Sequence, residues 1–282
     1  MILEVTNIIQ NLAAETTTVY LKGCPLRCGW CDRPQVRKPK KELLYDVENC
    51  IDCMVCFPEC SLDAHDFVNG QHVVDRNKCI GCMACADVCP AGALIPASRS
   101  MGTDAILAQC QKTLILGGGE PLVHHEGVLE LLEKAKAKGI ATCIETTGAF
   151  YPRQIPALLP YTDLFVFRIM DTDPARMRKQ TGAKLEVLLS NLRSVDAAGG
   201  RNQLLCKLIP GVNLEDDHAK ALAALYESLS NCDGIRPDPY VPVDPQAYSQ
   251  LDLTPPQYPA VETEALDRFI SVLREAGAKV IL

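Results

Sequence analysis

The stretch that decides the fold is Thr17-Thr18-Val19-Tyr20-Leu21-Lys22-Gly23-Cys24-Pro25-Leu26-Arg27-Cys28-Gly29-Trp30-Cys31. Its first five residues are typical of a strand, and the strand leads into a loop with three cysteines spaced Cys24-x3-Cys28-x2-Cys31. A 4Fe–4S cluster held by three thiolates has one iron without a protein ligand. An open metal position is where chemistry takes place, so this loop predicts a reaction centre.

Two more cysteine runs follow, and eleven of the fifteen cysteines lie in the three runs together. The later runs are Cys50-x2-Cys53-x2-Cys56-x3-Cys60 and Cys79-x2-Cys82-x2-Cys85-x3-Cys89-Pro90. As a pair they match bacterial ferredoxins with two clusters, in which the fourth cysteine of each run ligates the other cluster. Disulfides are the rival use, but regular CxxC spacing in a chain that starts without a secretion signal favours metal.

The segment from about residue 46 to 94 is rich in cysteine, poor in periodic pattern and internally repeated. Asn49-Cys50-Ile51-Asp52-Cys53-Met54-Val55-Cys56 resembles Lys78-Cys79-Ile80-Gly81-Cys82-Met83-Ala84-Cys85. Such a module has little apolar core and is folded by its metal clusters. We therefore expect an inserted ferredoxin-like domain at 46–94 that binds two 4Fe–4S clusters, within a main domain formed by 1–45 and 95–282.

The main domain alternates strands with amphipathic helices. Strands are predicted near 113–117, 140–145, 163–169, 203–209 and 234–240, and helices near 125–138, 152–159, 184–197, 216–230 and 262–276. With the strand before Cys24 this makes six βα units, which predicts a partial (β/α)6 TIM-type barrel, with a flat doubly wound sheet as the alternative. In both architectures the loops after the strands form the active face. Three such loops contain Cys24, Gly117–Pro121 and Glu145–Gly148.

Composition narrows the class of protein. A chain of 282 residues with 48% hydrophobic residues can bury a large core. The net charge of −7 argues against a nucleic-acid partner. No apolar run approaches the roughly 18–20 residues of a membrane span. The N-terminus does not resemble a signal peptide, so we expect a cytoplasmic protein without a membrane partner.

Cys24, Cys28 and Cys31, together with Gly118-Gly119-Glu120-Pro121, resemble the two signature motifs of the radical S-adenosylmethionine (SAM) superfamily. The resemblance implies that the open iron binds the amino and carboxylate groups of SAM. One electron then splits SAM into methionine and a 5′-deoxyadenosyl radical, while the protein supplies orientation and enclosure. It also implies that Gly118 to Pro121 orient the SAM amino group. Trp30 is then either an aromatic beside the adenine or a core residue.

The resemblance narrows to the activases of glycyl radical enzymes. Segments that resemble them are Leu21–Cys28, the double ferredoxin insert, Asp163–Phe165, Asp173-Pro174, Thr181-Gly182 and Leu208–Asn213. The resemblance implies a partner glycyl radical enzyme and a ferredoxin or flavodoxin as electron donor. It implies three 4Fe–4S clusters, with one auxiliary cluster on Cys50, Cys53, Cys56 and Cys89 and the other on Cys79, Cys82, Cys85 and Cys60.

Several positions depart from the family pattern. After the fourth strand, where the family has Asp-x-Lys, this chain has Arg168-Ile169-Met170. A family histidine that follows aligns with Met177. Further on, a family arginine aligns with Leu205 and a second family histidine aligns with Val241. The N-terminal Asp-Gly-Pro-Gly-Ile-Arg loop is replaced by 11–16. These losses predict a remodelled pocket around SAM and the approaching peptide.

Two charged residues of that pocket keep alternative interpretations. Arg168 either binds the SAM carboxylate, with good bidentate geometry, or forms a surface salt bridge. Glu145 either helps to hold SAM or a cation, or balances Arg168 on the same face.

Two other functions are compatible with the motifs. The first is a radical SAM enzyme that acts on another protein or on a small molecule. The second is a three-cluster electron-transfer protein that no longer cleaves SAM. The intact cysteine and Gly-Gly-Glu-Pro motifs favour SAM use, whereas the altered pocket favours the two alternatives.

The four remaining cysteines are scattered along strands and helices. We expect them to be small buried apolar residues, namely Cys110, Cys143, Cys206 and Cys232.

Overall fold

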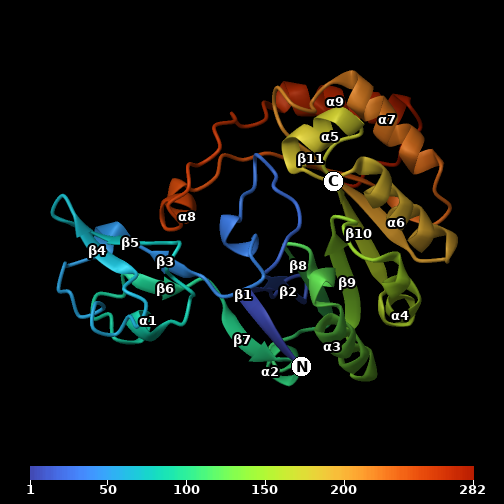
Figure 1. The fold of residues 1–282 in the computed structure, drawn as a ribbon. Helices are drawn as coiled ribbons and strands as arrows, with labels where there is room; N and C mark the ends of the chain where they lie inside the picture. The colour runs from blue at the N-terminus through green and yellow to red at the C-terminus, as the bar shows by residue number, and fades with distance from the viewer.

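One eight-stranded sheet organises the structure, a computed structural model that describes all residues 1–282 (Figure 1). Its strand order is β12-β11-β10-β9-β8-β2-β1-β7. Six strands run parallel to one another: β2 (Thr16–Leu21), β8 (Thr113–Gly118), β9 (Ala141–Thr146), β10 (Leu164–Ile169), β11 (Asn202–Leu208) and β12 (Cys232–Pro239). These are the six strands predicted from the sequence. The expectation of an α/β fold with a parallel central sheet is confirmed.

Two antiparallel strands that the sequence did not indicate extend this sheet. β1 (Ile2–Asn11) pairs with β2 on one side and with β7 (Arg99–Gly102) on the other. Leu3 and Val5 of β1 are buried at 2% and 1% exposure, so the strand contributes to the core. β12 and β7 stand at the two ends of the strand order, which leaves the sheet open.

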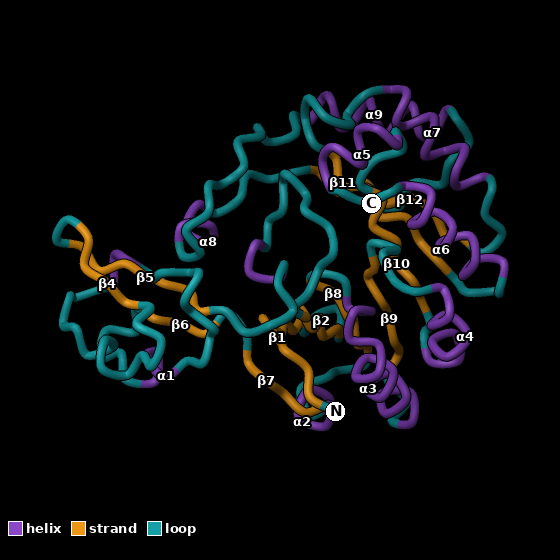
Figure 2. The backbone as a smooth tube through the Cα atoms, in the orientation of Figure 1, coloured by secondary structure: helices purple, strands orange, loops and turns teal.

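Helices pack against the sheet, as the purple segments of Figure 2 show. They are α2 (Thr103–Leu107), α3 (His125–Ala137), α4 (Ile155–Leu158), α5 (Pro174–Thr181), α6 (Leu185–Ala197), α7 (Asp216–Glu227) and α9 (Thr263–Glu275). Leu131 of α3, Leu192 of α6 and Leu222 of α7 join strand residues in a core of 33 buried side chains. Burial of this apolar area is the main stabilising contribution to the fold.

The helix predicted at 152–159 is broken into three short pieces. These are the 3-10 turn η4 (Pro152–Gln154), the single turn α4 and the 3-10 turn η5 (Leu159–Tyr161). A proline stands at the start of each piece and offers no backbone N–H, so a continuous helix cannot form. The other four predicted helices are present close to their expected ends.

Alternate residues of a strand point to opposite faces, so the parallel strands also present a second face. A small apolar cluster on that face consists of Cys143, Val166 and Leu205. Two residues further along the same strands, toward their carboxyl ends, stand Glu145, Arg168 and Lys207. The second face therefore changes from apolar to charged at the edge where the functional loops lie.

Residues 43–96 project from the sheet as a separate unit, on the left in Figure 1. The antiparallel pair β3 (Leu43–Tyr45) and β6 (Leu94–Pro96) forms its neck. Beyond the neck lie the hairpin of β4 (His65–Val68) and β5 (Gln71–Val74) and the single turn α1 (Ala84–Asp87). Its own apolar core contains eight buried residues, namely Leu43, Tyr45, Cys56, Val74, Met83, Cys85, Ala93 and Leu94.

A short helix, α8 (Pro245–Ser249), connects this unit to the first cysteine loop. The Gln246 amide donates to the Asp46 carboxylate at 2.9 Å, and the Tyr45 amide donates to the Gln250 carbonyl at 2.9 Å. The Tyr248 hydroxyl donates to the backbone carbonyl of Cys31. The α8 segment therefore fixes the projecting unit and the Cys31 end of the loop relative to each other.

Candidate active site

The first cysteine loop and the Gly-Gly-Glu-Pro loop lie side by side because they follow neighbouring parallel strands, β2 and β8. The Gly119 amide donates to the Leu21 carbonyl at 3.1 Å, and the Glu120 amide donates to the Gly23 carbonyl at 2.7 Å. These bonds continue the sheet pairing beyond the strand ends. The two motifs that were recognised separately in the sequence therefore form one structural unit.

Two glycines are required for this close approach. A Cβ on Gly119 would lie 2.2 Å from the Gly23 carbonyl oxygen and 3.0 Å from the Cys24 Cβ. Gly118 has a φ of +105°, and a Cβ there would lie 2.6 Å from the Leu21 carbonyl oxygen. A side chain at either position would push the loops apart, and the positive φ at Gly118 would add strain.

The three cysteines of the first loop line one cavity of about 510 Å³. Its other lining residues are Trp30, Asp32, Arg33, Val36, Gly118, Gly119, Thr147, Arg168, Met170 and Lys207. Burial raises the pKa of Cys24 to about 11 and that of Cys28 to about 12. These thiols are therefore protonated at neutral pH until a metal displaces the proton. The lining contains no fourth cysteine and no histidine, which fits a cluster with one open iron.

Backbone contacts hold the cysteine loop from the side opposite the sheet. The amides of Arg27 and Gly29 donate to the carbonyls of Thr181 and Gln180 at 2.8 and 3.1 Å, so the loop rests on the last turn of α5. The Arg37 guanidinium donates to the Cys28 carbonyl at 3.0 Å. The positions of the thiols are thus set before any metal is bound.

Trp30 is a core residue that also lines the cavity. It is 3% exposed and lines the cavity, and it also belongs to an apolar cluster with Met170 and Met177. Its ring meets that of Tyr258 edge-on, with centroids 6.4 Å apart. The methionines at two positions where the family carries Lys and His therefore form an apolar support behind the indole.

The Glu120 carboxylate faces the next loop and does not line the cavity. It is fully buried and accepts hydrogen bonds from the Thr146 hydroxyl and from the amide and hydroxyl of Thr147 at 2.7–2.9 Å. Burial raises the pKa of this carboxyl, and hydrogen bonds from Thr147 and Thr146 oppose the rise. Pro121, next to it, is buried at the start of the 3-10 turn η3 (Pro121–His124). Glu120 thus ties the loop after β8 to the loop after β9.

Arg168 points into the cavity, and no carboxylate lies within 4 Å of its guanidinium, so the surface salt bridge considered from the sequence is absent. Its Nη1 donates to the Gly118 carbonyl at 3.3 Å. Burial disfavours the charged form, but the carboxylates of Glu145, Asp32 and Asp238 outweigh this effect and raise the pKa of Arg168. Arg168 is therefore a permanent cation beside the cysteines.

Glu145 forms its ion pair with Arg236 at 3.6 Å and does not line the cavity. Glu145 acts on the Arg168 guanidinium through its charge, which raises the pKa of Arg168, while the cation within 4 Å of its carboxylate is Arg236. The geometric reason is that Arg236, on β12, reaches across the charged face of the sheet to Glu145.

Lys207 is a cavity residue that the sequence analysis missed. Its ammonium lies 3.2 Å from the Asp238 carboxylate, and the side chain lines the cavity opposite the cysteines. The motif comparison had aligned Leu205 with a missing family arginine, and Leu205 is buried in the small apolar cluster. The period of two along β11 places Lys207 on the same face as Leu205, so strand alternation was the signal that could have found it.

The projecting unit contains two further cavities, each lined by four cysteines. The first, of about 370 Å³, is lined by Cys50, Cys53, Cys56 and Cys89. The second, of about 380 Å³, is lined by Cys60, Cys79, Cys82 and Cys85. Each cavity thus draws three cysteines from one run and the fourth from the other run, which fits a pair of 4Fe–4S clusters.

Residues 36–42 contact both the first cysteine loop and the second of these cavities. The Cys24 amide donates to the Arg37 carbonyl at 3.0 Å. A Cβ on Gly81, next to Cys82, would lie 2.5 Å from the Lys41 carbonyl oxygen. The fully buried Lys22 ammonium donates to the Glu42 carboxylate at 2.9 Å. One short segment therefore separates the reaction centre from the second four-cysteine cavity.

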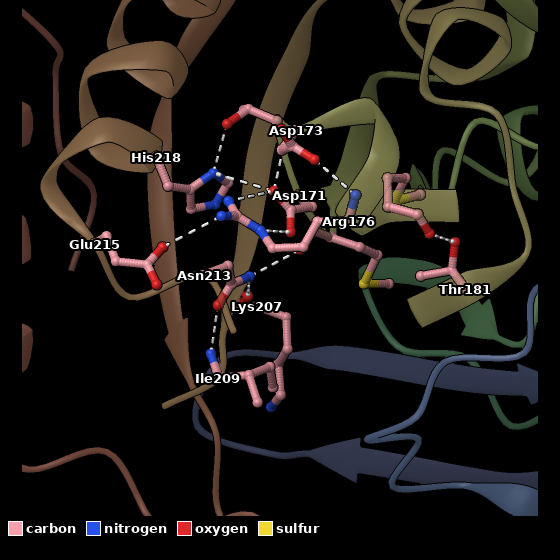
Figure 3. Close-up of polar contacts among 12 residues, drawn as sticks. Asp171, Asp173, Arg176, Thr181, Lys207, Ile209, Asn213, Glu215 and His218 are labelled. Atoms are coloured by element: carbon pink, nitrogen blue, oxygen red, sulfur yellow. Dashed lines mark hydrogen bonds and ion pairs between the residues drawn. The ribbon is translucent and has the colours of Figure 1, made fainter. Parts of the chain in front are cut away.

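A buried polar network lies at the carboxyl ends of β10 and β11 (Figure 3). The Asp171 carboxylate is fully buried and accepts two hydrogen bonds from Arg176, at 2.7 and 2.9 Å. His218 Nδ1 lies 2.7 Å from the Thr172 hydroxyl, and its Nε2 lies 3.3 Å from the Cys206 sulfur. None of these side chains lines the cysteine cavity, so the network is structural support for the loop after β10.

Comparisons with known proteins agree with this site. The family described as 4Fe-4S binding domain matches residues 72–95 and, through a second such model, residues 47–63. The choline trimethylamine-lyase activating enzyme of Oleidesulfovibrio alaskensis is 31% identical over 283 residues, covering 92% of this chain and 89% of that protein. The isethionate sulfite-lyase activating enzyme of Nitratidesulfovibrio vulgaris is 28% identical, covering 93% and 90%.

Solved structures show the same fold at lower identity. A radical SAM methyltransferase from Sphaerobacter thermophilus covers 99% of this chain and 76% of its own, with a TM-score of 0.56 and 16% identity. A domain of pyruvate-formate lyase-activating enzyme from Bacteroides vulgatus gives a TM-score of 0.51 at 21% identity, covering 59% of this chain and 96% of that domain.

The sheet, its glycine loop and the three-cysteine cavity have the arrangement of a radical SAM enzyme, and the identity to an activating enzyme of that superfamily over 92% of the chain shows that it is one. Within that superfamily, the sequence identity that extends over nearly the whole chain shows the family. The chain belongs to the activating enzymes of glycyl radical enzymes. None of its helices has the length and apolar character needed to cross a membrane.

Proposed function

We propose that the protein uses SAM, bound at the Cys24 cavity, to install a glycyl radical on a partner enzyme. The observation that carries this proposal is the cavity itself, in which three thiols are accompanied by no fourth cysteine or histidine and by the cations Arg168 and Lys207 at the strand ends, while Arg33 of the cysteine loop is paired with Asp32. When bound, a 4Fe–4S cluster and SAM would supply the electron, the open iron site and the 5′-deoxyadenosyl radical that abstracts a hydrogen atom. The chain's own side chains supply binding, orientation and enclosure.

The residues of the cavity have distinct roles in this proposal. Cys24, Cys28 and Cys31 hold the cluster. The Arg168 guanidinium and the Lys207 ammonium hold the SAM carboxylate, because they are cations of the lining that stand on the strand ends across from the cysteines. Trp30 provides an apolar wall for the adenine.

The glycine loop acts through its backbone in this proposal. Gly118 and Gly119 let their loop pack directly against the Cys24 loop and line the cavity, where their backbone would face the SAM amino group. Glu120 is a positioning residue, since its carboxylate holds Thr147, which lines the cavity.

The architecture around the cavity is proposed to be a partial (β/α)6 barrel with an inserted ferredoxin-like domain at about 46–94. Six consecutive parallel strands in an open sheet support the first part. The separate apolar core and the two four-cysteine cavities support the second. The insert would then hold two auxiliary clusters, and the enzyme three in all.

The electron would come from a reduced ferredoxin or flavodoxin and reach the Cys24 cavity through the insert. The contact of residues 36–42 with both the Cys24 loop and the Cys79–Cys82 loop supports this route. On this geometry the cluster held by Cys60, Cys79, Cys82 and Cys85 is the one next to the reaction centre.

The activity is tested with reduced, reconstituted protein and SAM. Release of 5′-deoxyadenosine is expected, and its complete absence would contradict SAM cleavage and favour an electron-transfer protein. With a candidate glycyl radical enzyme added, the expected result is a glycyl radical doublet in the EPR spectrum. Turnover of SAM without that doublet for any glycyl radical enzyme encoded beside this chain would favour a different protein or small-molecule substrate.

A further inference from the structure

Two buried histidines lie between the four-cysteine cavities of the insert. His72 is 3% exposed and lines the first cavity, and His65 is 7% exposed and lines the second. Their rings contact each other, with His65 Nδ1 2.9 Å from His72 Nε2. The two imidazoles thus form a direct hydrogen-bonded connection between the cavities.

The β4–β5 hairpin places both rings on one face. His72 stands opposite Phe67 in the antiparallel register, and His65 stands opposite Val74, so all four side chains point to the cavity side. The rings of Phe57 and Tyr45 pack against His72, with centroids 5.7 and 4.8 Å away. The imidazoles are therefore held in fixed orientations in a dry environment.

The donor and acceptor roles in this pair follow from the chemistry of a metal ligand. His72 Nδ1 lies 3.6 Å from Cys50 Sγ. A cysteine that ligates iron is a thiolate and can only accept. Cys56 Sγ lies 3.8 Å from His72 Nε2, but that nitrogen has the much shorter contact of 2.9 Å to His65 Nδ1. We therefore place the His72 proton on Nδ1, toward the nearer thiolate of Cys50. Its Nε2 then has a free lone pair, and the contact at 2.9 Å requires His65 Nδ1–H as the donor. The chain of donors runs from His65 to His72 to Cys50.

The second cavity has no counterpart to this donor. Its nearest equivalent is the Ala64 amide, which donates to Cys60 Sγ at 3.3 Å. No imidazole nitrogen lies within hydrogen-bond distance of the sulfur of Cys60, Cys79, Cys82 or Cys85. Both cavities are lined by four thiols, but only in the first does a histidine N–H lie within hydrogen-bond distance of one of the sulfur atoms.

We propose that the His65–His72 pair is a potential-setting device, in which His72 donates to the Cys50 thiolate and His65 fixes the tautomer that allows it to donate. A hydrogen bond to a ligand sulfur stabilises the more negative, reduced state of a cluster and so raises its reduction potential. The pair thereby makes the first auxiliary cluster easier to reduce than it would be without His72. The inference rests on the proposed function in assuming a cluster in each cavity.

The test is an EPR-monitored redox titration of the reconstituted full-length protein. His72→Phe removes the donor but keeps a ring of similar size, and we expect the potential of one cluster to fall by about 59 mV, equal to a tenfold change in its reduction equilibrium. His72→Asn, whose amide nitrogen can take the place of Nδ1, should restore most of that change. His65→Phe should lower the same potential by less. Val73→Ala, on the same strand but on the opposite face of the hairpin, is the matched control and should move no potential.

Three results would overturn the proposal. The first is unchanged potentials in His72→Phe with iron near twelve per chain, and the second is an equal fall in His72→Phe and His72→Asn. If His72→Phe loses iron, the potential of the cluster in His65→Phe is the deciding measurement. An unchanged potential in His65→Phe overturns the proposal as well. Wild-type protein with only about four irons would instead contradict the two auxiliary clusters, which separates failure of the proposed function from failure of this inference.

Discussion

The Cys24 loop and the insert both present thiols to a cavity, but they are held in place by different means. The Cys24 loop rests on a sheet whose apolar core contains 33 buried residues. The insert has a core of eight buried residues, and two of those eight are the proposed cluster ligands Cys56 and Cys85. The sheet can therefore position its cysteines without metal, whereas the insert depends on what its cysteines bind.

The two regions also differ in what surrounds the sulfur atoms. The Cys24 cavity combines three thiols with the cations Arg168 and Lys207 and the polar Thr147. The other two cavities combine four thiols with mostly apolar walls. The first arrangement leaves room and charge for a ligand, and the second encloses what it holds. In the proposed function, the site for chemistry and the sites for electron storage therefore differ in the number of thiol ligands and in the polarity of the cavity walls.

The largest expected effect separates the two regions directly. Cys24→Ala should abolish 5′-deoxyadenosine release and lower iron by about four per chain, because three thiolates are the minimum that holds the open cluster. Cys53→Ala is the matched control. It should retain SAM binding and release when a strong chemical reductant replaces the natural donor. Equal loss of release in both variants would contradict the division between reaction centre and electron supply.

Removal of iron should destabilise the insert much more than the sheet. After anaerobic chelation, amide hydrogen exchange in residues 43–96 should accelerate at least about a hundredfold, equal to about 3 kcal/mol of local stability. Strands β8 to β11 should keep their protection, since their core is apolar and independent of metal. Equal acceleration in both regions, read by mass spectrometry, would show that the insert and the sheet unfold as one unit.

Substitutions of Arg168 test whether the cations of the cavity bind the SAM carboxylate. Arg168→Met should weaken SAM binding about 10- to 100-fold, since hydrogen bonds to a charged group contribute about 1.5–3 kcal/mol. Arg168→Lys should lose less, because it keeps the charge but not the planar fork. Equilibrium dialysis of reconstituted protein measures both. A change below about twofold in Arg168→Met would assign the carboxylate to Lys207 alone, which Lys207→Met then checks.

The smallest effect concerns the polar network of Figure 3 in the sheet region. Burial lowers the pKa of His218 to about 4, while nearby Asp171 opposes the shift. The unfolded chain binds this proton near pH 6.5 and the folded chain only near pH 4, so His218 contributes stability above 6.5 that is lost as the pH falls toward 4. The loss should be on the order of 1–3 kcal/mol.

Chemical denaturation of wild type and His218→Asn at pH 7.5 and pH 5 measures this effect. The variant should be less stable at pH 7.5 but should lose less on acidification, because it has no imidazole to protonate. Parallel pH dependence in the two proteins would contradict the assignment to His218.

The sequence was sufficient for the parts of the fold that local pattern controls. The six parallel strands and four long helices follow from periodicity, and the cysteine spacing indicated which thiols share a cavity. β1 was missed because what buries it lies far away in the chain, since Leu3 packs against Gly127 of α3, more than a hundred residues later. α5 was missed because its sequence, PARMRKQT, is polar and has little apolar period.

The rest of the site could not be found from spacing because it depends on which residues tertiary structure brings together. Lys207 was overlooked because it lies between Leu205 and the Leu208–Asn213 segment, the two places that the motif comparison used. The contact of Arg236 with Glu145 crosses the sheet face and has no signature in the sequence. The sequence does not single out His65 and His72, since four cysteines already complete each set, and only the structure shows that the two rings meet.

The neck of the insert has a consequence for how such an enzyme can change over generations. β3 and β6 pair side by side, with Leu43 opposite Pro96, so the chain leaves and re-enters the main domain at nearly the same point. A module attached in this way can be lengthened, shortened or exchanged without moving the strands on either side of it. The insert, which is proposed to deliver electrons, can therefore be replaced during evolution without changing the sheet that holds the Cys24 cavity.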